Sequence, residues 1–256
     1  MHLRKIFRQV DKTEEPTGQP RIKERPGWVS PTYARSCEKP IDPLIAGTNR
    51  CFATLPNPHD IEGYKVIRTQ IMQKTGQEGG KTIMVTSPLR GEGKTTTAVN
   101  LAFTFAREFT QTVLLVDCDL RTQRIHGMLG IKSDRGLADY LLNDAPLSDL
   151  IIWPCFEKLT LISGGGGAKE SAELLGSPRM KELVQEMKTR YPDRYIFLDA
   201  PAVLSGADAM ALAPQVDYVL MVIAAGSTPL GEVRRALEVI PEGKMLGLIL
   251  NRYGRG

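Results

Sequence analysis

Runs of apolar residues alternate with helix-like patterns along most of this chain. Six apolar runs predict strands, at residues 82–87, 112–117, 158–163, 195–200, 216–225 and 245–251. Helical patterns are found among them at residues 94–108, 178–190 and 229–239. The runs are continuously apolar, which predicts that both faces of each strand are buried. We therefore expect an α/β fold in which helices flank both faces of a mostly parallel central sheet.

Another helix is predicted just ahead of the first strand, with Asp60 as its N-cap. Its apolar stripe would consist of Ile61, Tyr64, Ile67 or Arg68, and Ile71. This spacing is typical of a helix that packs one face on a core.

Residues 1–50 differ in composition from the rest of the chain. They carry 10 Lys or Arg and 6 Asp or Glu, so the whole net charge of +4 lies there. Eight of the 17 prolines fall within the first 60 residues, and hydrophobic periodicity is weak there. We expect residues 1–50 to be a basic, flexible N-terminal extension and residues 51–256 to form the folded domain. The extension would be a solvated tail, or would contact a membrane surface or a partner.

Composition and charge exclude several classes of protein. The longest run without a charged residue has 14 residues, 218–231, whereas a membrane-spanning helix needs roughly 20. The N-terminus has no apolar segment typical of a signal peptide. The domain is neutral and has no long basic run, so nucleic acid is not an expected partner. The four cysteines form no C-x-x-C pair, which favours a cytoplasmic protein with reduced thiols.

The segment after the first strand has the form of a phosphate-binding loop. Residues 87–96 read SPLRGEGKTT, and they depart from the strict G-x-x-x-x-G-K-[ST] pattern only at Pro88. Glycines allow the backbone to turn its N–H groups around phosphates, and the following helix points its N-terminus at the same anion. The candidate nucleotide-binding residues are Ser87, Arg90, Gly91, Glu92, Gly93, Lys94, Thr95 and Thr96.

Acidic residues follow two other strands. Asp117 and Asp119, with Arg121 after them, end the run at 112–117, and Asp199 ends the run at 195–200. Since the carboxyl ends of parallel strands meet at one edge, these side chains should lie beside the phosphate loop. Carboxylate, hydroxyl and phosphate oxygens are ligands that Mg²⁺ prefers. The expected metal residues are Thr95, Asp117 and Asp199.

These segments, in this order, resemble the bacterial tyrosine kinases (BY-kinases) of capsule and exopolysaccharide synthesis. The family lies within the MinD/ParA-related P-loop NTPases, and the resemblance spans about residues 58–253. Further similar segments are DLRTQRIHGMLGI, GLADYLL and EGYKVIRTQI. MinD and ParA proteins carry a signature lysine where this chain has Leu89, which favours the kinase branch.

The resemblance implies roles for the site residues. Lys94 and Thr95 would bind ATP and Mg²⁺. Asp117 and Asp119 would form the second Walker motif, and one of them would aid deprotonation of the tyrosine hydroxyl. Asp199 would form the third motif. The expected catalytic residues are therefore Lys94, Asp117 and Asp119.

The resemblance also implies contacts with other chains. Glu62, Lys65 and Arg68 match a family pattern that assembles ring-shaped oligomers, although Lys65 replaces an arginine. Tyr253 stands alone where the family usually has a tyrosine cluster, and it is a candidate phosphoacceptor. Without a membrane-spanning helix, the chain resembles the separate cytoplasmic type of kinase. That type is recruited to the inner face of the membrane by the cytoplasmic tail of a chain-length-determinant protein.

Three functions are consistent with the sequence. The first is an ATP-dependent protein-tyrosine autokinase that regulates polysaccharide synthesis, chain length or export. The second is a regulatory ATPase switch of the same membrane machinery without kinase activity, which the lone Tyr253 favours. The third is a MinD/ParA-like positioning ATPase.

Overall fold

An eight-stranded sheet forms the centre of the structure, a computed structural model that describes residues 37–55, 61–191 and 193–253. The strand order is β1-β4-β5-β3-β6-β2-β7-β8. The strands are β1 (Cys37–Glu38), β2 (Thr82–Thr86), β3 (Thr112–Asp117), β4 (Ile151–Trp153), β5 (Leu159–Ile162), β6 (Arg194–Asp199), β7 (Tyr218–Ala224) and β8 (Met245–Asn251). All neighbouring pairs are parallel except β4 with β5. The mostly parallel sheet is therefore confirmed.

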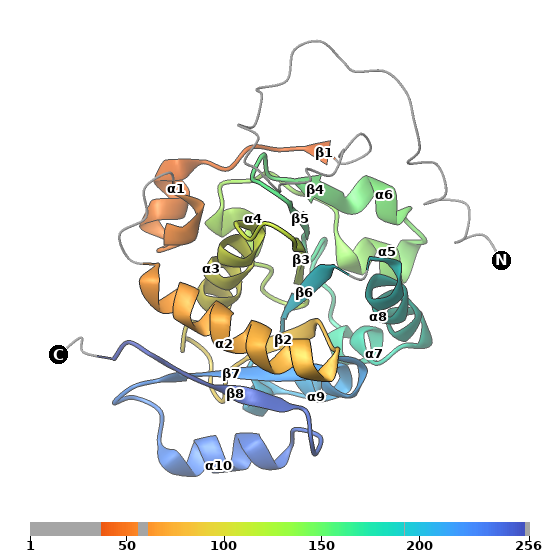
Figure 1. Cartoon of the computed structure of the whole chain (residues 1–256). Helices are drawn as coiled ribbons and strands as arrows, with labels where there is room; N and C mark the ends of the chain where they lie inside the picture. Colours follow the sequence, from red (N-terminus) through yellow and green to blue (C-terminus); the bar gives the residue numbers. More distant parts are fainter. Residues whose placement is uncertain (1–36, 56–60, 192, 254–256) are drawn as a thin grey trace.

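Helices cover both faces of this sheet, and Figure 1 shows α2 and α3 on one side and α8 on the other. The helices are α1 (Pro43–Thr48), α2 (Glu62–Glu78), α3 (Lys94–Ala106), α4 (Ile125–Met128), α5 (Leu137–Asn143), α6 (Leu147–Leu150), α7 (Ser171–Leu175), α8 (Pro178–Arg190), α9 (Asp208–Leu212) and α10 (Leu230–Glu238). Short 3₁₀ turns are η2 (Phe52–Thr54), η3 (Val203–Ser205) and η4 (Ala213–Gln215). All six predicted strands and the predicted long helices are present. The short elements β1, β4, α1, α5, α6, α7 and α9 were not predicted because their apolar patterns are too brief.

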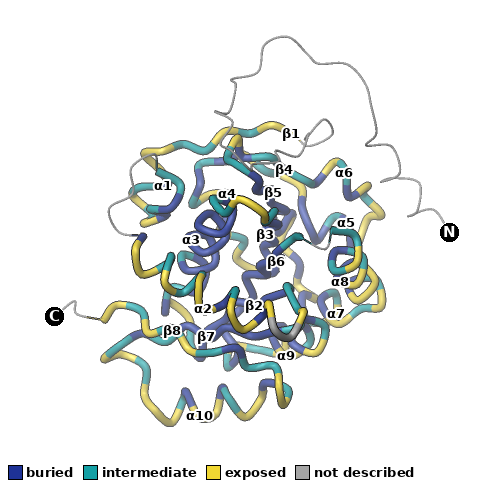
Figure 2. Tube along the Cα trace, viewed as in Figure 1, coloured by how far each residue is buried: buried dark blue, intermediate teal, exposed yellow. Residues whose placement is uncertain are grey.

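Two hydrophobic cores lie on opposite faces of the sheet. On β6, Tyr195 and Phe197 pack in the core on the α3 face, whereas Ile196 and Leu198 pack in the core on the α8 face. All four side chains are buried, which is why the strand is apolar at four successive positions. Figure 2 shows the central strands mostly in the dark blue of buried residues. The edge strand β8 departs from this rule, because Leu248 and Leu250 are about half exposed.

Helix α2 begins at Glu62, with Ile61 at the N-cap position. The predicted cap, Asp60, lies outside the described residues. Ile61 and Ile71 are buried against α3 and its neighbours, and Tyr64 and Ile67 are partly buried in the same core. The apolar stripe predicted for this helix is therefore confirmed.

Residues 37–50, which the sequence analysis assigned to the N-terminal extension, pack against the rest of the fold. β1 pairs with β4, and α1 and η2 follow it with Ala46, Cys51 and Ala53 completely buried. Because these contacts join residues far apart in sequence, weak periodicity in this segment did not reveal them. Residues 1–36, the remainder of the expected extension, lie outside the described residues.

Within the described part of the chain, none of the helices combines the length and apolar character needed to cross a membrane.

Candidate functional site

The phosphate-binding loop joins β2 to α3 at the carboxyl edge of the sheet. Gly91 and Gly93 have φ values of +82° and +95°, which glycine adopts without strain. Gly93 is the N-cap of α3, so the backbone N–H groups at the start of this helix remain available to an anion. A Cβ atom on Gly93 would lie 2.2 Å from Nδ2 of Asn251. The sequence pattern and the backbone therefore agree on an anion-binding loop.

Side chains from two distant segments hold this loop in place. Oε2 of Glu92 accepts a hydrogen bond from the Leu89 N–H at 2.7 Å, and Oε1 accepts one from the Thr228 hydroxyl. Nδ2 of Asn251 donates to the Glu92 carbonyl at 2.8 Å, and the Arg252 guanidinium donates to the Gly91 carbonyl. Glu92 thus stabilises the loop with its carboxylate, and only its backbone is suited to contact a phosphate.

Thr228, Asn251 and Arg252 were not predicted as site residues. A signal was available for Asn251, because it ends a predicted parallel strand, and such ends meet at the same edge. Thr228 lies between β7 and α10, where no local pattern marks it.

The remaining predicted loop residues occupy different positions. The Ser87 hydroxyl donates to the Leu89 carbonyl at 2.6 Å, and the Ser87 carbonyl accepts from the Val203 N–H at 2.8 Å. Thr96 is half-buried in the first turn of α3, and Arg90 is exposed on the loop.

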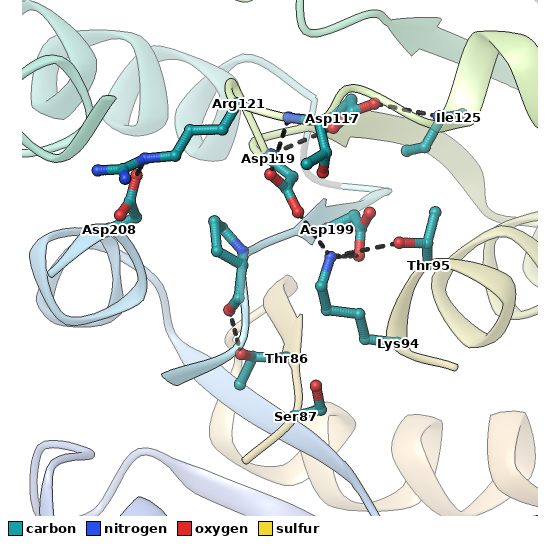
Figure 3. A network of polar contacts seen from close by, with 12 residues as sticks. Thr86, Ser87, Lys94, Thr95, Asp117, Asp119, Arg121, Ile125, Asp199 and Asp208 are labelled. Carbon is teal, nitrogen blue, oxygen red and sulfur yellow. Dashed lines mark hydrogen bonds and ion pairs between the residues drawn. The ribbon is translucent and has the colours of Figure 1, made fainter. Parts of the chain in front are cut away.

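The three predicted carboxylates gather around Lys94 (Figure 3). Asp117 and Asp199 are register partners at the ends of β3 and β6, and both are buried. Nζ of Lys94 lies 3.1 Å from Oδ2 of Asp119 and 3.6 Å from Oδ1 of Asp199. The same nitrogen is 3.3 Å from Oγ1 of Thr95. The sheet register therefore brings Asp117 and Asp199 together although they are 82 positions apart.

Burial and charge change the pKa values of this group. Burial and the charge of Asp199 raise the pKa of Asp117 to about 7. Burial likewise raises the pKa of Asp199, although Lys94 opposes the shift. Burial would also raise the pKa of Asp119, but Lys94 and Thr122 outweigh it and lower the value. Burial works against a charged Lys94, yet Asp199 and Asp119 raise its pKa. Lys94 and Asp119 are therefore a stable ion pair at neutral pH.

The residues present fit a magnesium ion bound with a nucleotide. Both carboxylate oxygens of Asp199 are buried and accept no hydrogen bond from the described residues, although Lys94 lies 3.6 Å from Oδ1. A ligand that completes this coordination would lower the cost of burying them. The described residues contain no cluster of three or more His, Cys, Asp or Glu suited to a metal. A magnesium ion would therefore rely on Thr95, on Asp199 and on water and phosphate oxygens, as such sites usually do.

Asp117 contributes differently from Asp199. Its Oδ1 accepts from the Asp119 N–H and its Oδ2 accepts from the Ile125 N–H, both at 3.1 Å. These bonds fix the turn that carries Asp119. Asp117 is close enough to influence a metal site electrostatically, while its hydrogen bonds also give it a structural role.

The three residues predicted to contact other copies have different surroundings in the structure. Glu62 and Lys65 form an exposed ion pair on the first turns of α2. Arg68 instead turns toward its own chain, where it donates to the Thr104 carbonyl at 2.9 Å and pairs with Glu108 at 2.6 Å. Tyr253 is 81% exposed and directly follows Arg252, whose guanidinium contacts the phosphate loop.

Comparisons with known proteins identify relatives of this chain. A family model described as an AAA domain matches residues 80–242, more than half of the chain. The chain is 36% identical over 200 residues to the tyrosine-protein kinase YwqD of Bacillus subtilis (strain 168), covering 77% of this chain and 83% of that protein.

Two solved structures show the same architecture. The chimerical protein CapA2B2 superposes with a TM-score of 0.73 at 28% identity, covering 80% of this chain and 90% of that one. The septum site-determining protein MinD of Pyrococcus horikoshii OT3, complexed with Mg-ADP, has a TM-score of 0.56 at 29% identity, covering 69% of this chain and 72% of that one.

The parallel sheet with a glycine loop before α3 defines a P-loop NTPase, which confirms the predicted fold class. Within that class, the chain belongs to the family of bacterial tyrosine-protein kinases. Membership confirms the resemblance drawn from the sequence, and it implies that the protein binds a nucleotide with a divalent metal ion.

Proposed function

We propose that this kinase transfers the γ-phosphoryl group of ATP, bound with Mg²⁺, to a tyrosine hydroxyl of another copy or a partner protein. The observation that carries the proposal is the contact of Lys94 with Asp119 and Asp199 beside the glycine loop. In the reaction, the tyrosine oxygen bonds to the γ-phosphorus while the bond to the β–γ bridging oxygen breaks. ADP leaves, and the phenolic proton must be accepted by a base.

Each residue of the site has a separate role in this reaction. Backbone N–H groups of the loop and the Lys94 ammonium bind phosphate oxygens. Thr95 and Asp199 hold the magnesium ion, and Asp117 adds negative charge beside it. When bound, the metal neutralises charge that develops on the phosphates. Asp119 is the least buried of the three carboxylates and faces Lys94, so it is the residue that we assign to orient the tyrosine hydroxyl and receive its proton.

We place this activity in the regulation of capsule or exopolysaccharide synthesis, chain length or export. The support is the resemblance to the family that serves this process. The membrane partner would be a chain-length-determinant protein whose cytoplasmic tail recruits the kinase to the inner face of the membrane. Glu62 and Lys65 are exposed and free to contribute to an oligomer, whereas Arg68 is engaged within its own chain.

A second function is a nucleotide-dependent switch without kinase activity. The observation that favours it is the direct contact of Asn251 and Arg252 with the phosphate loop. Through these contacts, nucleotide binding would change the conformation of the end of β8 and of the residues that follow it.

Incubation of the purified chain with γ-labelled ATP and Mg²⁺ separates the two functions. We expect phosphotyrosine in the wild type, none in Lys94→Ala, and undiminished labelling in Lys181→Ala, which removes an exposed lysine of α8. Loss of label in Tyr253→Phe would identify that residue as an acceptor. The partner's cytoplasmic tail belongs in a parallel reaction. ATP turnover without phosphotyrosine in either reaction would contradict the kinase and leave the switch.

A further inference from the structure

Arg121 occupies a distinctive place at the carboxyl edge of the sheet. It lies on the turn after β3, two residues beyond Asp119, and its side chain is 46% exposed. Its Nε donates to Oγ of Ser171 at 2.7 Å and lies 3.4 Å from Oδ1 of Asp208 (Figure 3). Neither the nucleotide-binding residues nor the carboxylate group around Lys94 includes this arginine.

The anchor beneath Arg121 is buried. Asp208 begins α9, its side chain is 4% exposed, and its carboxylate also accepts a hydrogen bond from the Ser171 hydroxyl. A buried carboxylate is costly unless it is paired, so this one strongly favours a single placement of the arginine. The pairing uses Nε. In the described part of the chain, neither terminal nitrogen of Arg121 donates a hydrogen bond. The guanidinium is therefore held in place by Nε, and its two terminal nitrogens remain available as hydrogen-bond donors.

The same edge of the sheet presents other exposed cations. Arg90 lies on the loop after β2, Arg124 on the turn after β3, and Lys169 on the segment after β5. Strands β2 and β3 each pair in parallel with β6, and β5 pairs in parallel with β3. The segments that follow β2, β3 and β5 therefore lie at the same edge of the sheet. Glu170 is an exposed acid at this edge. Arg90, Arg121, Arg124 and Lys169 therefore outnumber the exposed acids Glu170 and Glu173 on these segments.

We propose that Arg121, positioned by Asp208 and Ser171, binds a carboxylate next to the acceptor tyrosine and makes the kinase select tyrosines in acidic segments. The inference rests on the proposed function. Guanidinium groups bind carboxylates through paired donors, and a positioned guanidinium loses little entropy when it binds. Arg121 is two residues from Asp119, so a side chain close to the acceptor tyrosine falls within its reach.

This selectivity has a consequence for the chain's own tyrosine. Tyr253 stands between Arg252 and Arg255, so its flanks have the wrong charge for Arg121. An acidic tyrosine segment of a separate protein is therefore a better acceptor than the Tyr253 segment.

Binding of fluorescein-labelled peptides to the ADP-loaded full chain tests the inference without any turnover. One peptide has a tyrosine flanked by glutamates, and its match has glutamines at the same positions. We expect the wild type to bind the glutamate peptide about tenfold more tightly, a difference that one charge-assisted contact can supply. Arg121→Gln should reduce the ratio to near one. Asp208→Asn should reduce this ratio only in part, because Arg121 keeps its positive charge but its guanidinium is held less firmly.

A matched control separates a specific contact from general attraction. Arg234→Gln removes an exposed arginine from α10 and should leave the ratio unchanged. Equal affinity of the wild type for both peptides would overturn the inference, as would a ratio that Arg121→Gln leaves intact. Tighter binding of a third peptide, with phosphotyrosine in place of the flanking glutamates, would reassign Arg121 to phosphate and also overturn it. Because the readout is affinity, these results stand apart from any failure of the labelled-ATP assay.

Discussion

Asp117 is the residue whose charge depends most on its surroundings. Its pKa is raised from 3.8 to about 7, so the folded protein holds this proton more tightly than the unfolded chain does. The stability contributed by the protonated form is complete below about pH 4 and is lost as the pH rises through about 7. Asparagine at this position cannot titrate.

We therefore expect the unfolding free energy of the wild type to fall relative to Asp117→Asn between pH 5 and pH 8, on the order of 2 kcal/mol. Urea unfolding in EDTA, without nucleotide, measures the difference. Only the change with pH is diagnostic, since the asparagine amide also disturbs a backbone hydrogen bond in a way that does not depend on pH. A constant difference across this range would show that Asp117 is ionised in the folded protein.

Gly93 is a second residue whose role comes from its backbone. Its φ is +95°, and an added Cβ would lie only 2.2 Å from Nδ2 of Asn251, which leaves no room for a side chain. Gly93→Ala should weaken ATP binding at least tenfold, because left-handed backbone costs about 1–2 kcal/mol in other residues and the clash adds to it.

Isothermal titration with ATP and Mg²⁺ checks the Gly93→Ala effect. Gly76→Ala is the control, since Gly76 lies in α2 with nothing near its Cβ position. This helical substitution should stabilise the protein by about 0.5–1 kcal/mol and leave affinity unchanged. Normal ATP affinity in Gly93→Ala would mean that the loop rearranges before it binds.

At the scale of elements, α2 and α3 are joined by Arg68. The family pattern assigns this residue to an interface between copies, but its guanidinium contacts Thr104 and Glu108 at the end of α3. Arg68→Ala should cost about 1–3 kcal/mol of stability, because it leaves the Thr104 carbonyl and the partly buried Glu108 carboxylate without their charged donor. Lys65→Ala, which breaks an exposed pair with Glu62, should change stability by less than about 0.5 kcal/mol.

Denaturant unfolding together with sedimentation distinguishes the two roles of Arg68. Loss of stability in a dilute monomeric sample would confirm the contact within the chain. Unchanged stability with a lower oligomeric state would instead place Arg68 between copies.

At the scale of the whole molecule, residues 37–50 pack into the fold, although their composition predicted a flexible extension. Ala53 donates its N–H to Asn100 at 2.9 Å, the Asn100 side chain donates to the Arg50 carbonyl, and β1 pairs with β4. A chain that starts at residue 51 loses β1, α1 and the Arg50 carbonyl that Asn100 contacts. It should be less stable by about 2 kcal/mol or more than a chain that starts at residue 37.

Thermal and urea unfolding of the two shortened chains provide the measurement. Equal stability would show that the contacts of residues 37–50 contribute nothing net to the fold.

Several features could be predicted from local sequence because their signals are short-range. Six of the eight strands follow from apolar runs, since a strand that is buried on two faces favours apolar residues at successive positions. The phosphate loop follows from neighbouring glycines, a lysine and a threonine. Asp117 and Asp199 follow from their positions at strand ends, and the register of β3 with β6 confirms that they meet.

Contacts between distant residues were decided only by the tertiary structure. The bond from Asn251 to Glu92 spans 159 positions, and the hydrogen bond from Arg121 to Ser171 spans 50. No periodic pattern encodes which polar side chains meet across such distances, because the meeting depends on strand order and helix packing. The sequence by itself therefore determined the fold class and the position of the phosphate loop. Tertiary structure decided what closes the loop, what Arg68 contacts and which groups position Arg121.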